Sequence, residues 1–259
     1  MGDQSCVNTR PQTGRSYPPG YGSVEPVANY RPWDVDERFQ AAYELVREAT
    51  MVDVFRLWTL WFIARQVPAG DVLEVGSWRG GSGTMIARAL AEPAGGQGAR
   101  GQGARGQHTP GAGERNVYLA DTFAGVVKAS ARDTYYKGGE HANTSIGTVR
   151  DLLERAGVPH VHLLPGVFPD ESAAAIADRR FALCHIDVDV YQSAKDAFEW
   201  VWPRMVRGGV VVFDDYGFYG CEGVTSLIEE IAGRPDDAGG RLTVIPSLSG
   251  QATVTRTVY

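Results

Sequence analysis

Cysteine is scarce in this sequence, with three residues in a chain of 259. Cys6, Cys184 and Cys221 form no Cys-x-x-Cys pair, and their odd number does not make a disulfide framework. The pattern is typical of reduced thiols in a reducing compartment. We therefore expect a cytoplasmic protein.

Long hydrophobic runs are absent as well. The longest uncharged apolar stretch covers residues 57–64, whereas a membrane-spanning helix needs about 20 residues. Residues 1–23 contain no apolar core of a signal peptide. These absences predict a protein without a membrane partner.

Positive charge is in deficit, because 25 Lys and Arg residues stand against 31 Asp and Glu residues, giving a formal net charge of -6 at pH 7. Such a chain does not attract phosphate backbones, so we expect no nucleic-acid partner. With 43% hydrophobic and 22% charged residues, the composition is that of a folded globular protein.

The chain divides into an arm and one domain. Residues 1–34 are rich in Pro, Gly, Tyr and Asn, which predicts a mobile N-terminal arm that orders on a neighbouring subunit or a substrate. Residues 35–259 are expected to form a single domain. Within it, residues 94–113 repeat Gln-Gly-Ala-Arg-Gly and predict a disordered Gly-rich insertion. Residues 122–143 have weak periodicity and are expected to form a lid.

Two amphipathic helices are expected before the first strand, because apolar residues recur there at helical spacing. The expected apolar positions are Phe39, Ala42, Tyr43 and Val46 in the first helix and Met51, Val54, Phe55, Trp58 and Phe62 in the second.

Short apolar runs and helical stretches then alternate. Strands are expected at 71–75, 116–120, 161–164, 181–188 and 209–213, and helices at 82–92, 144–156, 171–178, 193–206 and 223–232. This alternation is typical of a parallel sheet with helices on both faces. Two strand-like segments around Ser249 and Gly250 predict a C-terminal antiparallel hairpin. The expected fold is an α/β domain with a seven-stranded, mostly parallel sheet.

A glycine-rich turn follows the first expected strand, where residues 73–83 read Leu-Glu-Val-Gly-Ser-Trp-Arg-Gly-Gly-Ser-Gly. Glycines in such a turn let the backbone approach a ligand and direct N–H groups toward it. The spacing differs from the Gly-x-Gly-x-x-Gly of dinucleotide sites and favours a smaller nucleoside such as S-adenosylmethionine (SAM). The alternative is a tight turn without a ligand.

Asp121 ends the second expected strand, where a carboxylate can accept both ribose hydroxyls of an adenosine group. An isolated Asp in this position is more often a helix cap. Its combination with the glycine turn favours the ribose role.

Four aspartates follow the fourth and fifth expected strands, Asp187 and Asp189 after one and Asp214 and Asp215 after the other. Because parallel strands end at the same edge of a sheet, these carboxylates should converge. They repel one another unless they are protonated or bind a cation, and Asp oxygens suit Mg²⁺. Solvation of the first pair and turn capping by the second are the structural alternatives.

Two histidines accompany this acidic group. His141 lies in the expected lid and is an alternative candidate for a catalytic base, although a lone loop histidine is usually just solvated. His185 alternates with Asp187 along the fourth strand and is expected to support the site from behind. Tyrosines in the arm and lid could stack on a bound ligand or pack on a neighbouring subunit; these are Tyr17, Tyr21, Tyr30, Tyr135 and Tyr136.

Together these motifs resemble the macrocin O-methyltransferase family, metal-dependent SAM enzymes that methylate sugar hydroxyls of antibiotics. The resemblance covers about residues 48–232. It is carried by Gly-Ser-Trp-Arg-Gly-Gly-Ser at 76–82, Ile-Asp-Val-Asp-Val-Tyr at 186–191 and Phe-Asp-Asp-Tyr-Gly at 213–217. It implies a Rossmann-like class I SAM-dependent methyltransferase fold.

The resemblance also implies roles for individual residues. The SAM pocket would be lined by Met51, Glu74, Gly76, Ser77, Trp78, Arg79, Gly80, Ser82, Asp121, Thr122, Phe123, Gly166, Val167 and Phe168. Mg²⁺ would be held by Asp187, Asp214 and Asp215, with Asp189 as the general base.

The expected function is therefore SAM- and Mg²⁺-dependent O-methylation of a sugar hydroxyl on a glycosylated secondary metabolite, in antibiotic biosynthesis, by an enzyme that self-associates. The arm, the insertion and the lid depart from the family pattern, so the acceptor glycoside stays open. One alternative is a glycosyltransferase that uses Asp187 and Asp189 to hold a metal and a nucleotide sugar. Another is a non-catalytic protein that binds SAM or a nucleotide.

Overall fold

The computed structural model describes residues 17–22, 24, 27–92, 115–235 and 241–257. The first part of the expected arm, residues 1–16, and the whole expected insertion, residues 94–113, lie outside the described residues.

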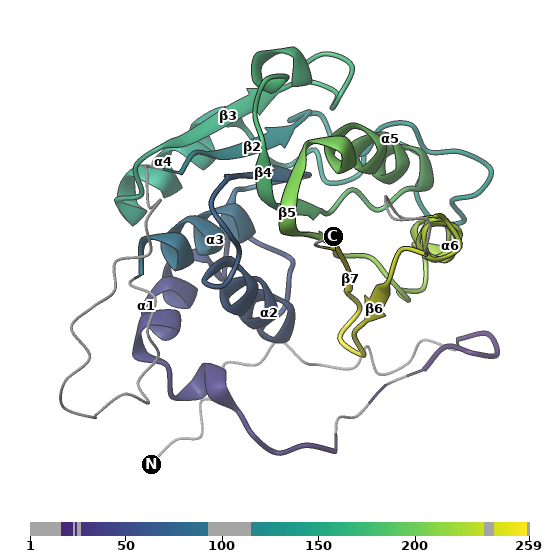
Figure 1. The fold of residues 1–259 in the computed structure, drawn as a ribbon, viewed down its shortest axis with the longest axis horizontal. Helices are drawn as coiled ribbons and strands as arrows, with labels where there is room; N and C mark the ends of the chain where they lie inside the picture. The colour runs from purple at the N-terminus through teal and green to yellow at the C-terminus, as the bar shows by residue number, and fades with distance from the viewer. Residues whose placement is uncertain (1–16, 23, 25–26, 93–114, 236–240, 258–259) are drawn as a thin grey trace.

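A seven-stranded sheet forms the centre of the described chain, with strand order β3-β2-β1-β4-β5-β7-β6. The strands are β1 Asp71–Val75, β2 Val117–Asp121, β3 Val161–Pro165, β4 Phe181–Ile186, β5 Met205–Phe213, β6 Val244–Pro246 and β7 Ala252–Thr255. Strands β1 to β5 pair in parallel, and the β6–β7 hairpin joins β5 in antiparallel orientation. Figure 1 shows the sheet between its helices. The expected mostly parallel sheet with a C-terminal hairpin is confirmed.

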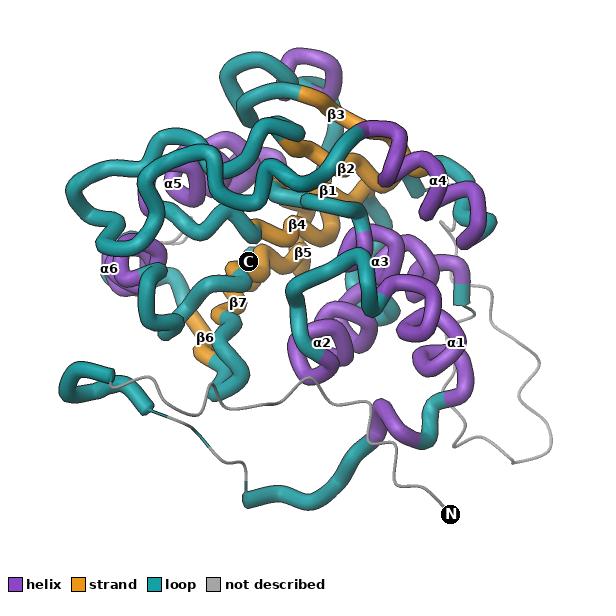
Figure 2. Tube along the Cα trace, turned by 180° about the vertical axis from the view of Figure 1, so that it is seen from behind, coloured by secondary structure: helices purple, strands orange, loops and turns teal. Residues whose placement is uncertain are grey.

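Helices cover both faces of the sheet (Figures 1 and 2). The helices are α1 Glu37–Val46, α2 Val54–Ala64, α3 Gly81–Ala91, α4 Ile146–Ala156, α5 Tyr191–Val201 and α6 Glu222–Ala232, with 3-10 turns at Pro32–Asp34, Ala173–Ile176 and Trp202–Arg204. The buried apolar side chains form two clusters. Helices α1 to α4 contribute to one cluster, and α5 and α6 contribute to the other. None of the described helices is long and apolar enough to cross a membrane.

Side-chain caps fix where several helices begin. The carboxylate of Asp36 accepts the backbone N–H groups of Arg38 and Phe39, and Asp53 does the same at the start of α2. Gly157 ends α4 with a left-handed φ of 61°, as its position after an amphipathic run predicts.

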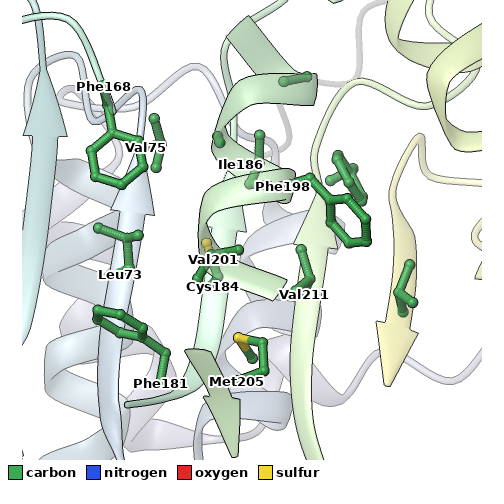
Figure 3. Packing of buried hydrophobic residues seen from close by; sticks show 14 of the residues in the cluster. Leu73, Val75, Phe168, Phe181, Cys184, Ile186, Phe198, Val201, Met205 and Val211 are labelled. Atoms are coloured by element: carbon green, nitrogen blue, oxygen red, sulfur yellow. The ribbon is translucent and has the colours of Figure 1, made fainter. Parts of the chain in front are cut away.

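Successive side chains of each strand enter the two apolar clusters in turn, because they point to opposite faces of the sheet. Figure 3 shows Leu73 and Val75 of β1 beside Cys184 and Ile186 of β4 in one of them, all buried. Burial raises the pKa of the Cys184 thiol, so this cysteine behaves as a small apolar side chain.

The predicted limits of two helices were wrong. Residues 171–178 form only the short 3-10 turn Ala173–Ile176, because the segment is too short to make a stable helix and buries few side chains. The helix expected at 193–206 begins at Tyr191 and ends at Val201, since Pro203 interrupts it. The next strand, β5, consequently starts at Met205, earlier than expected.

The helix α2 is confirmed, but its buried face was predicted incorrectly. Val54 is buried as expected, and Phe55 and Trp58 are half-buried. Met51 and Phe62, however, are 53% and 54% exposed. The buried positions include Leu57, Leu60, Trp61 and Ala64. Nearly every residue of α2 is apolar, so spacing alone could not select the face that contacts α3 and the sheet.

We expect the Leu119→Ala variant to lose about 2–5 kcal/mol of unfolding free energy. Leu119 is completely buried in β2, and its side chain fills the space above Gly83 of α3. Urea unfolding measures the change, and Leu248→Ala is the matched control because Leu248 is 83% exposed. Equal losses in the two variants would contradict this description of the core.

Candidate active site

The site lies where β1, β2, β4 and β5 end. The backbone N–H of Asp187 donates to the carbonyl of Val75 at 2.9 Å, and the N–H of Asp214 donates to the carbonyl of Ile186 at 2.9 Å. These bonds extend the sheet by one residue beyond each strand. As a result, the first aspartate after β4 and the first after β5 lie at the same edge as the glycine turn.

The glycine turn after β1 packs directly against the end of β4. Gly76 has a left-handed φ of 90°, and a Cβ atom at this position would lie 1.7 Å from the carbonyl oxygen of Asp187. Only glycine allows this approach without moving the backbone. The expected cofactor turn and the expected metal ligands are therefore joined by direct contact.

Asp121 connects the turns that follow β1 and β2. One carboxylate oxygen accepts the N–H of Trp78 at 2.7 Å, and the other accepts the N–H of Phe123 at 2.6 Å. Burial raises the pKa of Asp121, and these backbone hydrogen bonds act in the opposite direction. Each oxygen retains a further lone pair, so the carboxylate can still accept ribose hydroxyls.

A cavity of about 280 Å³ opens at this edge of the sheet. The expected SAM-pocket residues that line it are Met51, Gly76, Ser77, Trp78, Ser82, Asp121, Thr122, Gly166 and Phe168. The hydroxyl oxygen of Ser77 is buried there and has no hydrogen-bond partner among the described residues. An unpartnered polar atom on a cavity wall is the kind of group that a bound ligand satisfies.

Five residues expected in the SAM pocket are not among the described residues lining the cavity. Glu74 is buried beneath it and contacts His185, while Arg79 donates from Nε to the carbonyl of Asn143 at 3.1 Å. Gly80 precedes α3, Phe123 packs against an apolar cluster, and the Val167 N–H donates to Glu171. Glu74 thus supports the cavity floor from below.

The four expected aspartates do converge, and all of them line the cavity. Burial raises the pKa values of Asp187 and Asp215 well above the ordinary range, and the neighbouring carboxylates add to the effect. Burial also raises the pKa of Asp189. Like charges held this close in a buried site favour either protonation or a bound cation.

Asp214 differs from the other three because cationic side chains surround it. Arg56 of α2 donates from Nη1 to Oδ2 of Asp214, and Gln251 donates from Nε2 to Oδ1 at 2.7 Å. Nε2 of His185 lies 3.3 Å from the same Oδ1, and Nδ1 of His185 lies 2.9 Å from Glu74 Oε1. Burial opposes ionisation of Asp214, but Arg56 and His185 outweigh it and lower its pKa.

His185 is held between two carboxylates in a fully buried position. Each ring nitrogen faces one carboxyl group, and this arrangement favours the imidazolium form. Burial lowers the pKa of His185, yet the bonds to Asp214 and Glu74 raise it to about 10. The expectation that His185 stands behind the site agrees with this position.

Oxygen ligands for a divalent cation are available in the arrangement. Ligand atoms of His185, Asp187 and Asp214 lie within 4.8 Å of one another, as do those of Asp189, Asp215 and Cys221. Asp214 accepts two hydrogen bonds at Oδ1 and one at Oδ2, so a lone pair at Oδ2 stays free. Each of the two groups contains carboxylates, the kind of ligand that Mg²⁺ prefers.

The expected lid brings His141 and Tyr136 to Asp189. Nε2 of His141 lies 4.0 Å from Oδ2 of Asp189 and 3.4 Å from the Tyr136 hydroxyl. Tyr136 donates a hydrogen bond to Asp189, which offsets part of the rise in pKa caused by burial. The two alternative bases of the sequence analysis, Asp189 and His141, are therefore neighbours.

Sequence reasoning missed three residues that shape this centre. Arg56 and Cys221 lie in segments that resemble the family, but neither was given a role there. Arg56 pairs with Asp53 at 2.9 Å, and Cys221 follows β5 by several residues. Gln251 lies in the hairpin, where no local motif indicates a site. Their positions depend on how distant segments of the chain pack.

Strand order, glycine turn and Asp121 together define a class I SAM-dependent methyltransferase fold. The O-methyltransferase NovP matches this structure with a TM-score of 0.60 at 22% identity, covering 81% of this chain and 83% of that chain. The calicheamicin methyltransferase CalS11 matches with a TM-score of 0.57 at 18% identity, covering 91% of this chain and 98% of that chain.

The model of the macrocin O-methyltransferase family matches residues 25–231, and the chain belongs to this family. It is 32% identical over 207 residues to 8-demethyl-8-(2,3-dimethoxy-alpha-L-rhamnosyl)-tetracenomycin-C 4'-O-methyltransferase of Streptomyces olivaceus, covering 71% of this chain and 72% of the relative. It is 29% identical over 163 residues to mycinamicin III 3''-O-methyltransferase of Micromonospora griseorubida, covering 59% of this chain and 57% of the relative.

Family membership identifies the protein as an O-methyltransferase. The resemblance inferred from the sequence is confirmed. The glycosyltransferase and the non-catalytic binding protein are set aside as alternatives.

We expect the His185→Ala variant to lose about 3–5 kcal/mol of unfolding free energy, because it leaves Glu74 without its buried cation and removes one of the two cations that contact Asp214. Chemical denaturation followed by circular dichroism measures the loss. His162→Ala is the control, since His162 is exposed and contacts Asn116 at the edge of the sheet. A loss no larger than in this control would show that the buried ion network does not stabilise the fold.

Proposed function

We propose that this enzyme transfers the methyl group of SAM to a sugar hydroxyl of a glycosylated secondary metabolite, in antibiotic biosynthesis, with Mg²⁺ bound by Asp187, Asp214 and Asp215. The observation that carries the proposal is the convergence of four aspartates on the cavity that the glycine turn and Asp121 also line. The names of the relatives support it, because each describes O-methylation of a glycosylated compound or an antibiotic precursor.

Residues at the β1 and β2 ends would hold the cofactor. Asp121 accepts the ribose hydroxyls, and the unpartnered hydroxyl of Ser77 offers a further hydrogen bond. Met51, which is 53% exposed, and Phe168 supply apolar walls of the cavity. Arg79, Gly80, Phe123 and Val167 would act from the adjoining turns, and Glu74 from beneath the cavity through its contact with His185.

The acidic centre would hold the cation and the acceptor. When bound, Mg²⁺ lowers the pKa of a coordinated hydroxyl and orients it. Arg56 and His185 keep Asp214 ionised, and Gln251 fixes the direction of its carboxylate. The raised pKa values of Asp187 and Asp215 are those of carboxylates whose ionised forms a cation would stabilise.

Asp189 would accept the proton that the acceptor hydroxyl loses. Its backbone N–H donates to Asp215 at 2.9 Å, and its carboxylate accepts a hydrogen bond from Tyr136. These contacts fix the carboxylate beside the metal ligands, where a hydroxyl can lie between the base and the methyl donor. His141, at 4.0 Å, stabilises the ionised carboxylate when the imidazole is protonated.

Self-association is part of the proposal. Val27, Tyr30 and Val35 are 101%, 74% and 66% exposed in the segment before α1, an apolar surface that a second subunit would cover. Light scattering after size-exclusion chromatography measures the oligomeric state.

The Asp187→Asn variant is expected to bind Mg²⁺ or Mn²⁺ at least 10-fold more weakly while SAM binding is retained, because a carboxylate ligand is lost and the cofactor turn is kept. Isothermal titration calorimetry measures both affinities. Asp178→Asn is the matched control, since that side chain is 85% exposed. Full methyl transfer by the wild-type enzyme in excess EDTA would refute the metal site.

The Asp189→Asn variant is expected to lower kcat by about 10²–10⁴-fold with little change in SAM affinity, because the amide cannot accept the proton. Steady-state kinetics with a glycoside acceptor measure the effect, with His141→Gln assayed in parallel. A larger loss of kcat in His141→Gln would make His141 the base. An effect limited to KM would instead assign Asp189 to acceptor binding.

A further inference from the structure

Aromatic side chains gather next to the cavity, where Phe218 and Tyr219 line it. Together with Tyr135 and the half-buried Tyr17 and Tyr21, which contact other rings of the group, they form what we call the aromatic rim. Tyr219 is 50% exposed, Tyr135 is 60% exposed and Phe218 is 37% exposed. Exposed rings gathered next to a polar cavity are typical of a binding surface.

Tyr219 joins the N-terminal segment to this surface. Its ring centroid lies 5.7 Å from that of Tyr17 and 5.4 Å from that of Tyr21, both in edge-to-face geometry. Tyr219 itself lines the cavity. The described part of the N-terminal segment therefore reaches the loop after β5, at the acceptor end of the proposed site.

The C-terminal hairpin supports Phe218. A Cβ atom on Gly250 would lie 2.1 Å from Cε2 of Phe218, so the ring rests directly on the backbone of the hairpin turn. The guanidinium of Arg56 lies 4.8 Å from the centre of the same ring. Phe218 thus contacts both a glycine and a cation, in a position set by three separate segments of the chain.

Tyr135 extends the aromatic rim toward the proposed base. It packs next to Gly220, whose added Cβ would lie 3.2 Å from Cβ of Tyr135. Its ring also contacts Tyr136 edge-to-face at 5.2 Å, and Tyr136 donates to Asp189. The rim is therefore continuous with the acidic centre where the sugar would bind.

The described lining of the cavity is mostly acidic. Five of its residues are aspartates, and only Arg56 and His141 are basic. Arg56 is already paired with Asp53 and Asp214. A neutral glycoside adds no negative charge to a centre whose carboxylates already repel one another.

We propose that the aromatic rim binds a planar, unsaturated aglycone, while the attached sugar enters the acidic centre. This inference rests on the proposed function. Flat ring systems stack on tyrosine and phenylalanine rings over a larger area than a puckered aliphatic ring can. It follows that glycosyl transfer precedes methylation: the sugar moves from its nucleoside diphosphate to an aglycone oxygen, with release of the diphosphate and a proton, before this enzyme acts.

The test compares acceptors that share a sugar and differ in what it carries. The probes are 4-methylumbelliferyl α-L-rhamnoside, cyclohexylmethyl α-L-rhamnoside, methyl α-L-rhamnoside and TDP-rhamnose. Each is titrated by calorimetry into the full-length enzyme saturated with S-adenosylhomocysteine, with and without Mg²⁺. We expect the aryl rhamnoside to bind at least about 10-fold more tightly than the methyl rhamnoside, as added aromatic contacts imply.

Substitutions in the aromatic rim test whether it causes the tighter binding of the aryl rhamnoside. Tyr219→Ala should reduce the preference for the aryl probe to less than about 3-fold, while Tyr219→Phe should keep it because the ring is retained. Phe62→Ala is the control, since Phe62 is 54% exposed on α2 and is not among the described residues that line the cavity. Binding of S-adenosylhomocysteine to each variant shows that the cofactor site is intact.

Several outcomes would overturn the proposal. These are tightest binding of TDP-rhamnose, equal binding of the aryl and cyclohexylmethyl probes, no binding of any probe, or a preference that Tyr219→Ala leaves unchanged. If the proposed function itself were wrong, the enzyme would not bind S-adenosylhomocysteine, and this result distinguishes the two failures. The preference for the aryl probe would then be measured with the cofactor-free enzyme, and it would still decide whether the rim binds aromatic groups.

Discussion

The buried ion network of Glu74, His185, Asp214 and Arg56 is the constraint on which the site depends. It links β1, β4, the end of β5 and α2 through side chains that are almost fully buried. Each member is costly to bury alone, and each is stabilised by its neighbours. Because Arg56 and His185 lower the pKa of Asp214, this carboxylate stays ionised at the end of β5 even though burial opposes it.

The fold could be read from the sequence because its main determinants are local. Alternating apolar runs specify buried parallel strands, and caps such as Asp36, Asp53 and Gly157 mark helix limits. Errors arose where local patterns were ambiguous. A uniformly apolar α2 offered more than one face to bury, and the short segment at 171–178 resembled a helix without enough length to form one.

The candidate site was predictable to the extent that it consists of residues at strand ends. The order of strands brings Asp121, Asp187 and Asp214 to one edge, so a motif at each end was enough to expect their convergence. Arg56 and Gln251 could not be found in this way, because they reach the centre from a helix and a hairpin far away in the sequence. Their contribution is a property of tertiary packing.

The contact between Gly76 and the Asp187 carbonyl makes the cofactor turn and the acidic strand end parts of one rigid body. In the proposed reaction, the backbone of the sheet then sets the distance between methyl donor and acceptor. The loop after β5 beyond Asp215 and the N-terminal segment can vary in sequence while this distance is preserved, whereas Tyr136 and His141 of the expected lid are tied to Asp189. In this architecture a new acceptor can be acquired by changing only surface segments, without redesigning the catalytic centre.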